Sequence, residues 1–358
     1  MWHTTVEAPD AVAAEWAALA DRSAADPFAH PDWWLPWGAS FAEERLAVVT
    51  VRDGAVLRAL APVLVDGDTV RLAQNDHVPW VGVLADDAAA ADVLVAGLLG
   101  MRQPALRVGP TALDGPLASA VRRAAAQARC RTLERPVRYS PYAEPSRAAD
   151  ISELLDTGFR RDLRRRRRRL EEQGRVEVTV HRGGADLAER LDEAFAVELR
   201  QWKGAERTAI ASRPETLAFY TDVAEAASRR GDLELTVLRL DGRAISFTLV
   251  LRHHKALYGL KTAYDPEYAR FSPGQLLQRE VFADAQRRGI DRYEFLGQAD
   301  PYKLRWTSGR HELGTVVVYA RTSAGTAAYV THRYLRPAAA RVRDRLAAAR
   351  SRITRPTR

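Results

Sequence analysis

Two alternating segments that flank an Asp241-Gly242 pair constrain the fold of this chain more than any other feature. Asp-Gly between two runs of β-forming residues is typical of a two-residue hairpin turn, so antiparallel strands are expected here. A third strand and then an amphipathic helix follow at once, which predicts a β-sheet covered by helices, an α+β fold. The segments are Leu233–Leu240, Ala244–Arg252, Ala256–Tyr264 and Gln275–Arg288.

The same order of helices and strands is expected twice along the chain. Residues 1–145 form an N-terminal unit, residues 146–322 form a second unit that opens with a helix from Ile151 to about Gln173, and residues 323–358 form a basic helical tail. Tyr139–Ser146 is predicted to be a short linker. So short a connection predicts that the two units form one rigid body with a cleft between them.

Composition excludes several classes of protein. With 46% hydrophobic and 28% charged residues, the chain is globular rather than disordered. The single cysteine, Cys130, excludes an internal disulfide framework and a cysteine-based zinc site, and we predict no metal. The N-terminus lacks a basic region followed by an apolar stretch, and the apolar runs are too short to span a bilayer. We therefore expect a cytoplasmic protein without a transmembrane segment.

Charge is divided unevenly along the chain. Residues 1–150 contain 14 arginines and 19 acidic residues, whereas residues 151–358 contain 40 basic and 27 acidic residues. A basic second half suits an anionic partner, and a phosphorylated cofactor, a nucleic acid and an acidic membrane surface remain open. Eight of the ten residues from Arg160 to Arg169 are arginine. This helix is either a solvated face, a contact for phosphates of a donor or acceptor, or a surface for nucleic acid.

A basic loop leads from the third strand into the helix that follows it. Pro273 stands at an early helical position, where its missing N–H costs nothing. The backbone amides of residues 274–276 are expected to face an anion, with Arg270 and Ser272 just before them. The loop is therefore either a phosphate cradle or the start of an ordinary capped helix.

Several motifs occur in the order found in one known family. Together with the hairpin, the strand, the loop and the helix, they resemble the core of the GNAT superfamily of acyltransferases, and in particular its CelD-like branch, over residues 155–310. The family loop, Arg/Gln-x-x-Gly-x-Gly/Ala, binds the pyrophosphate of acyl-CoA, and this chain has Pro273 and Gln275 at its two small-residue positions. The motifs are Phe159-Arg160-Arg161-Asp162-Leu163-Arg164-Arg165, Trp202-Lys203-Gly204, Tyr264-Asp265-Pro266-Glu267-Tyr268-Ala269-Arg270-Phe271-Ser272-Pro273-Gly274-Gln275-Leu276-Leu277, Tyr293-Glu294-Phe295-Leu296-Gly297 and Tyr302-Lys303-Leu304-Arg305-Trp306.

The resemblance implies an N-acyltransferase that moves an acetyl or another acyl group from acyl-CoA to an amine. The acceptor would be a small molecule or a component of the cell envelope or of a polysaccharide. Fem-like transferases are related to this branch and consist of two GNAT-like units in tandem, each a central mixed β-sheet flanked by helices, which is the architecture expected here. They take an aminoacyl group from tRNA. An aminoacyl-tRNA-dependent transferase and a non-catalytic module for anions or nucleic acid therefore remain alternatives, and the oligomeric state stays open.

Lysine usage and the family motifs together indicate candidate catalytic residues. The 54 basic residues include four lysines, Lys203, Lys255, Lys261 and Lys303, and a lysine kept against such a bias favours a role for a compact ammonium. Lys303 is expected to hold an oxygen of the donor or acceptor. Glu294 is expected to orient Lys303 or to act as the general base.

The other candidates divide between donor and acceptor. Backbone amides of the strand Leu260–Tyr264 are expected to polarise the donor carbonyl. The donor-binding candidates are Arg270, Ser272, Pro273, Gly274, Gln275, Thr262 and Tyr264. The acceptor-binding candidates are Trp202, Lys203, Tyr302, Trp306, Asp76 and His77.

Overall fold

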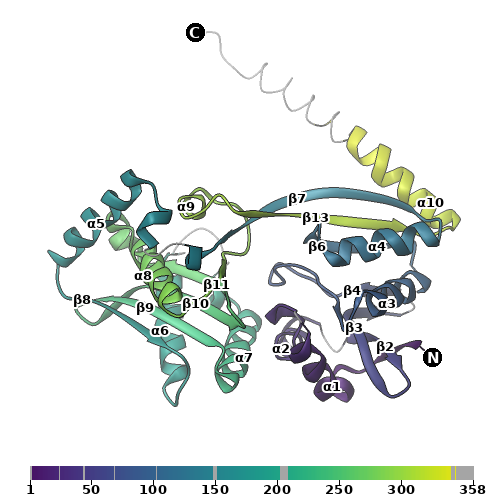
Figure 1. The fold of residues 1–358 in the computed structure, drawn as a ribbon, viewed down its shortest axis with the longest axis horizontal. Helices are drawn as coiled ribbons and strands as arrows, with labels where there is room; N and C mark the ends of the chain where they lie inside the picture. Colours follow the sequence, from purple (N-terminus) through teal and green to yellow (C-terminus); the bar gives the residue numbers. More distant parts are fainter. Residues whose placement is uncertain are drawn as a thin grey trace, which may run out of the picture.

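Two β-sheets covered by helices form the molecule, and the α+β prediction is confirmed (Figure 1). Within the parts of the chain that are described, no helix is both long and apolar enough to cross a membrane. The computed structural model describes residues 2–23, 25–42, 45–67, 69–101, 103–147, 151–201, 209–339 and 343.

The first sheet comes from the N-terminal part of the chain, and its described pairs are all antiparallel. The strand order is β1-β2-β3-β4, with β5 paired to β3. An Asp53-Gly54 turn joins β2 to β3, and Gly54 takes the left-handed φ of 59° that such a turn requires. The elements are β1 (Trp2–Glu7), α1 (Pro9–Arg22), η1 (Pro27–Ala29), α2 (Pro31–Phe41), β2 (Leu46–Asp53), β3 (Val56–Asp66), β4 (Thr69–Leu72), β5 (Leu84–Ala85) and α3 (Ala88–Gly100).

The second sheet has eight strands and crosses the expected boundary between the units. Its order is β6-β13-β7-β12-β11-β10-β9-β8. The predicted linker is instead the end of strand β7, which pairs with β13 as far as Pro141 and with β12 at Tyr142 and Ala143. The strands that pair with β7 lie far along the chain, so no local sequence pattern predicts this pairing. The strands are β6 (Ala105–Ala112), β7 (Arg131–Ala143), β8 (Val176–His181), β9 (Leu233–Leu240), β10 (Arg243–His253), β11 (Ala256–Tyr264), β12 (Arg292–Glu294) and β13 (Arg310–Tyr319).

Helices cover both faces of the second sheet. Phe247 and Leu249 of β10 join a core with α6 and α7, whereas Ile245 and Val250 join a second core with α5 (Thr157–Glu171) and α8. The predicted hairpin and the helix after the third strand are thereby confirmed. The helices are α4 (Pro116–Gln127), α6 (Leu187–Gln201), α7 (Pro214–Arg230), α8 (Pro273–Arg287), α9 (Pro301–Leu304) and α10 (Ser323–Val330).

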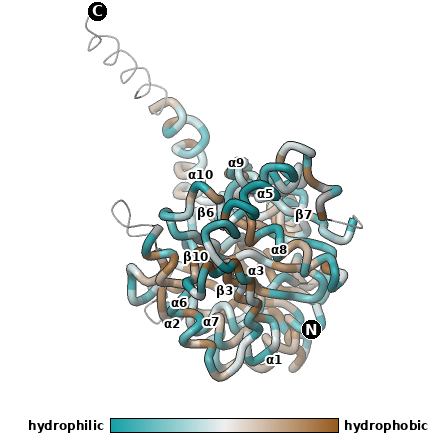
Figure 2. Tube along the Cα trace, turned by 90° about the vertical axis from the view of Figure 1, so that its left-hand side faces the viewer, coloured by the Kyte–Doolittle hydropathy of each residue, from teal (hydrophilic) through white to brown (hydrophobic). Residues whose placement is uncertain are grey.

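The arginine-rich helix begins later than predicted. The helix expected from Ile151 to Gln173 is interrupted, because Asp156 caps a new helix start by accepting a hydrogen bond of 2.9 Å from the N–H of Phe159. Arginines cover the outer surface of this helix, which Figure 2 shows as a hydrophilic segment. The two helices are η3 (Ile151–Leu154) and α5 (Thr157–Glu171), and the buried residues of α5 are Phe159, Leu163 and Leu170.

The C-terminal helix extends away from the end of β13 (Figure 1). A basic helical tail was predicted over residues 323–358. The described residues are helical from Ser323 through residue 339, and a π-helical turn over Thr331–Leu335 comes just before Pro337. Residues 340–342 and 344–358 lie outside the described part of the chain.

Strands β11 and β12 pair over three residues and then separate. Ala256–Tyr258 runs parallel to Arg292–Glu294. The chain then turns at Leu296, a non-glycine residue with a φ of 55°. Strand β10 pairs with the other edge of β11 as far as Tyr264. The edge of β11 beyond Tyr258 is therefore open on the side that β12 has left.

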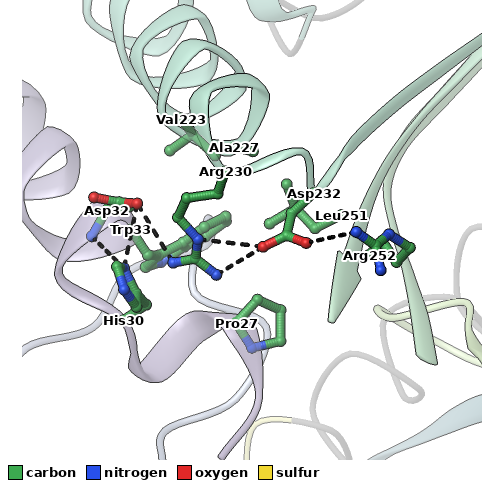
Figure 3. Close-up of a pocket in the computed structure, with 10 residues that line it drawn as sticks. All are labelled: Pro27, His30, Asp32, Trp33, Val223, Ala227, Arg230, Asp232, Leu251 and Arg252. Carbon is green, nitrogen blue, oxygen red and sulfur yellow. Dashed lines mark hydrogen bonds and ion pairs between the residues drawn. The ribbon is translucent and has the colours of Figure 1, made fainter. Parts of the chain in front are cut away.

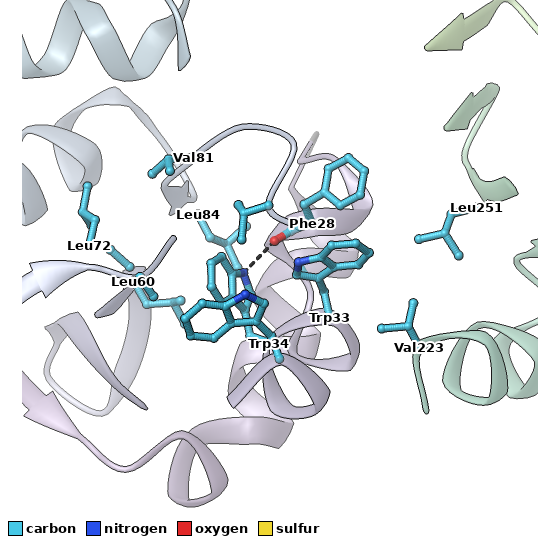
Figure 4. Packing of buried hydrophobic residues seen from close by; sticks show 14 of the residues in the cluster. Phe28, Trp33, Trp34, Leu60, Leu72, Val81, Leu84, Val223 and Leu251 are labelled. Carbon is cyan, nitrogen blue, oxygen red and sulfur yellow. Dashed lines mark hydrogen bonds between the residues drawn. The ribbon is translucent and has the colours of Figure 1, made fainter. Parts of the chain in front are cut away.

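One hydrophobic core continues from the first unit into the second. Trp33 of α2 is 2% exposed, and its ring centroid lies 5.0 Å from that of Phe219 on α7. Figure 4 shows Trp33 on the side of the first unit that faces Val223 and Leu251 of the second. Apolar surface is thus removed from water at the seam itself, which holds the two units together as one body.

A row of ion pairs crosses the same seam. Arg230 of α7 lies 3.4 Å from Asp32 of α2 and 2.9 Å from Asp232, which in turn lies 3.2 Å from Arg252 (Figure 3). The Arg230–Asp32 pair joins the two units, and Asp232 and Arg252 continue the row within the second unit.

Candidate functional site

Two cavities adjoin the open stretch of β11. The first, which we call the donor cavity, has a volume of about 310 Å³ and lies between β11, the loop before α8 and α9. Five of the predicted donor residues line it, together with Tyr302, which was predicted on the acceptor side. The five are Thr262, Tyr264, Ser272, Gly274 and Gln275.

The loop beside the donor cavity is held by a side chain from another helix. Ser272 takes a left-handed conformation, with φ 51° and ψ 57°, and so turns the chain from η5 (Pro266–Phe271) into α8. The first residue of α8 is the buried Pro273. Arg166 of α5 donates hydrogen bonds to Ser272 Oγ at 2.7 Å and to the carbonyl oxygen of Arg270 at 3.0 Å. The arginine-rich helix therefore positions the loop.

The backbone amides of this loop do not all face outward as predicted. The N–H groups of Gln275 and Leu276 donate to the carbonyl oxygen of Ser272, at 2.9 and 3.2 Å. Of the three amides expected to bind an anion, that of Gly274 alone has no acceptor among the residues that the structure describes. A Cβ on Gly274 would lie 3.8 Å from the Tyr264 ring, which is ordinary contact, so a methyl group fits but a larger side chain enters the cavity.

Two predicted residues support the donor cavity from outside its lining. Trp306, predicted on the acceptor side, is 2% exposed, and its indole N–H donates to Gln275 Oε1 at 2.8 Å. Trp306 thus fixes a donor-cavity side chain. The guanidinium of the exposed Arg270 lies 4.6 Å from the centroid of the Phe271 ring and donates to Gln173 Oε1 at 3.3 Å.

The second cavity, which we call the acceptor cavity, has a volume of about 390 Å³ and lies between the two units. Asp76 and His77, the two N-terminal residues predicted to bind the acceptor, line it from the first unit. Tyr220 of α7 and Leu260 and Lys261 of β11 line it from the second unit. The two cavities therefore lie along adjoining residues of one strand.

Burial shifts the titratable groups around the acceptor cavity toward their neutral forms. It lowers the pKa of Lys261, an effect that the carboxylate of Glu198 opposes. Burial raises the pKa of Glu198, whose Oε2 accepts a hydrogen bond of 2.8 Å from the N–H of Ile210. Burial also lowers the pKa of His77, whose Nδ1 lies 3.3 Å from the hydroxyl of Tyr220. A neutral imidazole at this position can accept a proton from a bound amine.

Lys303 is a buried lysine that holds the chain leaving β12. It is 6% exposed, and its Nζ donates to the carbonyl oxygens of Leu296 at 3.0 Å and Gln298 at 2.9 Å. Its ion-pair partner is Asp300, at 3.0 Å. Leu296 and Gly297 of the same turn line the acceptor cavity, whereas Lys303 lines neither cavity. Lys303 thus supports a wall of the acceptor cavity.

Glu294 faces a different neighbour from the one expected. Its two carboxylate oxygens lie 3.1 and 3.2 Å from Nε2 of His311, and it does not pair with Lys303. It belongs to a buried polar group with Asp26, whose Oδ2 accepts a hydrogen bond of 2.5 Å from Trp80 Nε1. Burial, and to a smaller extent the charge of Glu294, raises the pKa of Asp26 to about 6.

Sequence reasoning missed the basic side chains of the acceptor cavity. Arg138 of β7 and Arg213, which precedes α7, line it together with Lys261. Lys261 is one of the four lysines of the sequence. Because it directly precedes the predicted donor residue Thr262, it could have been predicted as a site residue. Two other predicted acceptor residues, Trp202 and Lys203, lie outside the described residues.

Solved structures share this fold at low sequence identity. FemX is 12% identical over 88% of this chain and 97% of its own, with a TM-score of 0.59. L-PGS from Bacillus licheniformis is 11% identical over 92% of this chain and 98% of its own, with a TM-score of 0.53. The C-terminal domain of a putative lysylphosphatidylglycerol synthetase from Agrobacterium fabrum is 13% identical over 90% of this chain and 97% of its own, also with a TM-score of 0.53. Among curated proteins no relative matches the sequence.

A family model matches the part of the chain that carries the donor cavity. The model of the acetyltransferase (GNAT) domain covers residues 157–304, from the start of α5 to the end of α9. This span includes the open stretch of β11, the loop held by Arg166 and the start of α8. Residues 157–304 therefore carry a GNAT acetyltransferase domain, which supports an acyltransferase, and the fold of the chain is similar to that of FemX.

Proposed function

We propose that this chain transfers an acyl group from acyl-CoA to an amine, and that each cavity holds one of the two substrates. One observation carries the proposal, namely that both cavities are lined by the same stretch of β11. Thr262 and Tyr264 line the donor cavity, and Leu260 and Lys261 line the acceptor cavity, where β12 has left the strand edge. Two substrates that enter from different sides would meet at this strand, and their proximity would supply much of the rate acceleration.

The donor cavity suits the pantetheine arm of CoA, which is uncharged and contains two amides. Its polar lining consists of uncharged groups, among them the hydroxyl of Thr262 and the side-chain amides of Gln275 and Gln278. Nε2 of Gln278 is buried and has no acceptor among the described residues. A buried unpaired N–H is costly, and a pantetheine carbonyl would satisfy it. The CoA pyrophosphate would lie near the N–H of Gly274, where the dipole of α8 favours an anion.

The reaction needs positioning and the passage of one proton from the acceptor nitrogen to the leaving thiolate. The carbonyls of Lys261 and Ala263 accept hydrogen bonds from side chains of β10, so the alternation of the strand turns the N–H of Thr262 to the open edge. This N–H would polarise the thioester carbonyl as the acceptor nitrogen attacks. The C–N bond forms, the C–S bond breaks and CoA leaves as the thiolate. His77 would take the proton released by the nitrogen and return it to the thiolate.

The surface of α5 favours a second donor, an aminoacyl-tRNA. Arg161, Arg164, Arg165 and Arg168 are exposed and follow the helical spacing of a single face. The same helix contacts the donor loop through Arg166. Such a face suits the phosphates of a tRNA, and the donor would then be of the kind that Fem-like transferases use.

Titration of one preparation with acetyl-CoA, free CoA and aminoacyl-tRNA separates these donors. We expect both CoA compounds to bind with a stoichiometry of one, and acetyl-CoA to release a free thiol when primary amines are added. Gln278→Leu should weaken CoA binding about tenfold, because it removes the unpaired amide. Gln127→Leu, at an exposed site on α4, should leave it unchanged. Binding of aminoacyl-tRNA without binding of CoA would replace the proposed donor with the alternative.

A further inference from the structure

The acceptor cavity has an excess of positive charge. Arg138, Arg213 and Lys261 line it, and among the described residues Asp76 is the one carboxylate in its lining. His77 also lines it, and burial lowers the pKa of that imidazole, so it adds little charge at neutral pH. The donor cavity, in contrast, has an uncharged lining. The positively charged side chains therefore line the cavity that is assigned to the acceptor and not the one assigned to the donor.

Arg138 has an incomplete set of partners. One of its terminal N–H groups donates to the carbonyl oxygen of Pro79 at 2.6 Å. Its Nε is buried and has no acceptor among the described residues. Burial lowers the pKa of Arg138, and the charge of Asp76 opposes this shift without forming an ion pair with the guanidinium. The guanidinium of Arg138 therefore has a donor free for another acceptor. Its forked N–H groups fit an oxyanion best.

The two other cations also lack an ion-pair partner in the part of the chain that the structure describes, although Lys261 Nζ lies 5.1 Å from the centroid of the Tyr220 ring. No carboxylate of a described residue forms an ion pair with Lys261 or with Arg213. The carboxylate of Glu198 acts on Lys261 through its charge, but it accepts its hydrogen bond from the N–H of Ile210. Elsewhere in the described chain, arginines are commonly matched by acids, as in the row at the seam (Figure 3). The acceptor cavity thus concentrates cations that form no ion pair with an acidic group of the described residues.

We infer that the acceptor is an amine that carries an oxyanion, a carboxylate or a phosphate, and that Arg138, Arg213 and Lys261 recognise this group. The inference rests on the proposed function, since it describes the second substrate of the same reaction. Asp76 would attract the ammonium form of the acceptor as it enters. The oxyanion would engage the cations, and the amine would then be directed toward the open edge of β11. Neutral amines lack the group that holds them in this orientation.

Matched pairs of acceptors test the inference. Ethanolamine and phosphoethanolamine differ in a phosphate, as do glucosamine and glucosamine 6-phosphate, whereas ethylamine and β-alanine differ in a carboxylate. Thiol release from acetyl-CoA gives kcat/KM for each compound. We expect the charged member of at least one pair to exceed its neutral partner about tenfold or more. The pair that shows the difference distinguishes a phosphate from a carboxylate.

Two arginine variants locate the effect. Arg213→Gln, at an exposed residue before α7, should reduce the preference for the charged acceptor about tenfold. Arg229→Gln, at an exposed residue of α7 outside the cavity, is the matched control and should retain the preference. Because Arg213 is exposed, loss of folding does not complicate this comparison. An equal effect of both variants would assign the preference to general surface charge and overturn the inference.

Binding of the acceptor without donor separates this inference from the proposed function. If the protein fails to bind acyl-CoA but binds glucosamine 6-phosphate more tightly than glucosamine, and Arg213→Gln removes the difference, the proposed donor is wrong and the anion site stands. If acetyl-CoA binds and no charged compound reacts or binds better than its neutral partner, the proposed function stands and this inference is overturned.

Discussion

The guanidinium of Arg166 and the hydroxyl of Ser272 lie 2.7 Å apart, although 106 residues separate them in the sequence. The same guanidinium lies 2.8 Å from the carboxylate of Asp162, one turn earlier in α5, so its direction is fixed. Ser272 has a left-handed backbone, which is unfavourable for serine and persists only where neighbours support it. One arginine of the arginine-rich helix thus holds the turn that begins the donor loop.

Arg166→Ala should weaken binding of acetyl-CoA about tenfold, because the loop loses two hydrogen bonds to a charged donor. Arg164→Ala is the control, since Arg164 is exposed on the same helix and has no partner among the described residues. Calorimetric titration of both variants measures the effect. Equal affinities in the two variants would mean that α5 does not position the donor loop.

Gly274→Ala should leave thermal stability unchanged or slightly higher, because a Cβ fits at 3.8 Å from Tyr264 and alanine favours a helix over glycine. Gly274→Val should abolish measurable binding of CoA, since the added methyl groups occupy the donor cavity. Gly100→Val is the matched control, at a helical glycine with open space around it. Thermal melts and titration with CoA check this pair of outcomes, and tight CoA binding by the valine variant at position 274 would contradict the assigned donor cavity.

Lys303→Ala should lower both stability and turnover. The substitution removes the donor of the carbonyl oxygens of Leu296 and Gln298. Because this region is buried, the loss costs about 2 kcal/mol or more of unfolding free energy. Turnover falls because the same turn forms a wall of the acceptor cavity. Lys303→Arg should restore little, since a planar guanidinium does not fit the position of the ammonium. Denaturant titration measures the stability, with the exposed Lys255→Ala as the control. An alanine variant as stable as the parent would show that the turn does not depend on Lys303.

The pH dependence of kcat/KM should show an acid limb below pH 6.5. Burial lowers the pKa of His77 below its ordinary value of 6.5. The imidazole accepts a proton only in its neutral form, so activity is present above the folded pKa and is lost as the pH falls through it. In His77→Gln this limb should disappear along with most of the activity. A pH–rate profile of the variant that keeps the parental acid limb would assign the proton transfer to another group.

The elements with local signals could be predicted from the sequence. The Asp241-Gly242 turn and the alternating segments around it define a hairpin, and Ser272 to Gln275 mark a helix start. The donor loop is contiguous, so five of its predicted residues do line one cavity. The end of β7 was mistaken for a linker, because its pairing with β12 and β13 joins segments that are distant in sequence.

The acceptor cavity could be predicted only in part, because it is assembled from both units. Asp76 and His77 were predicted to bind the acceptor, but Arg138 and Arg213 have no local motif. Lys261 and Lys303 were both among the four lysines noted in the sequence, and Lys303 was the one expected to be catalytic. The structure separates their roles, since Lys303 is enclosed by oxygens of the protein whereas Lys261 faces the cavity. That distinction depends on tertiary contacts.

A structure determined with acetyl-CoA bound tests the central claim most directly. The quantity to measure is the distance from the thioester carbonyl oxygen to the backbone nitrogen of Thr262. The account predicts that the pantetheine arm occupies the donor cavity and that this distance is within hydrogen-bonding range, about 3 Å. Acetyl-CoA bound elsewhere, or with its thioester away from the open edge of β11, would contradict it.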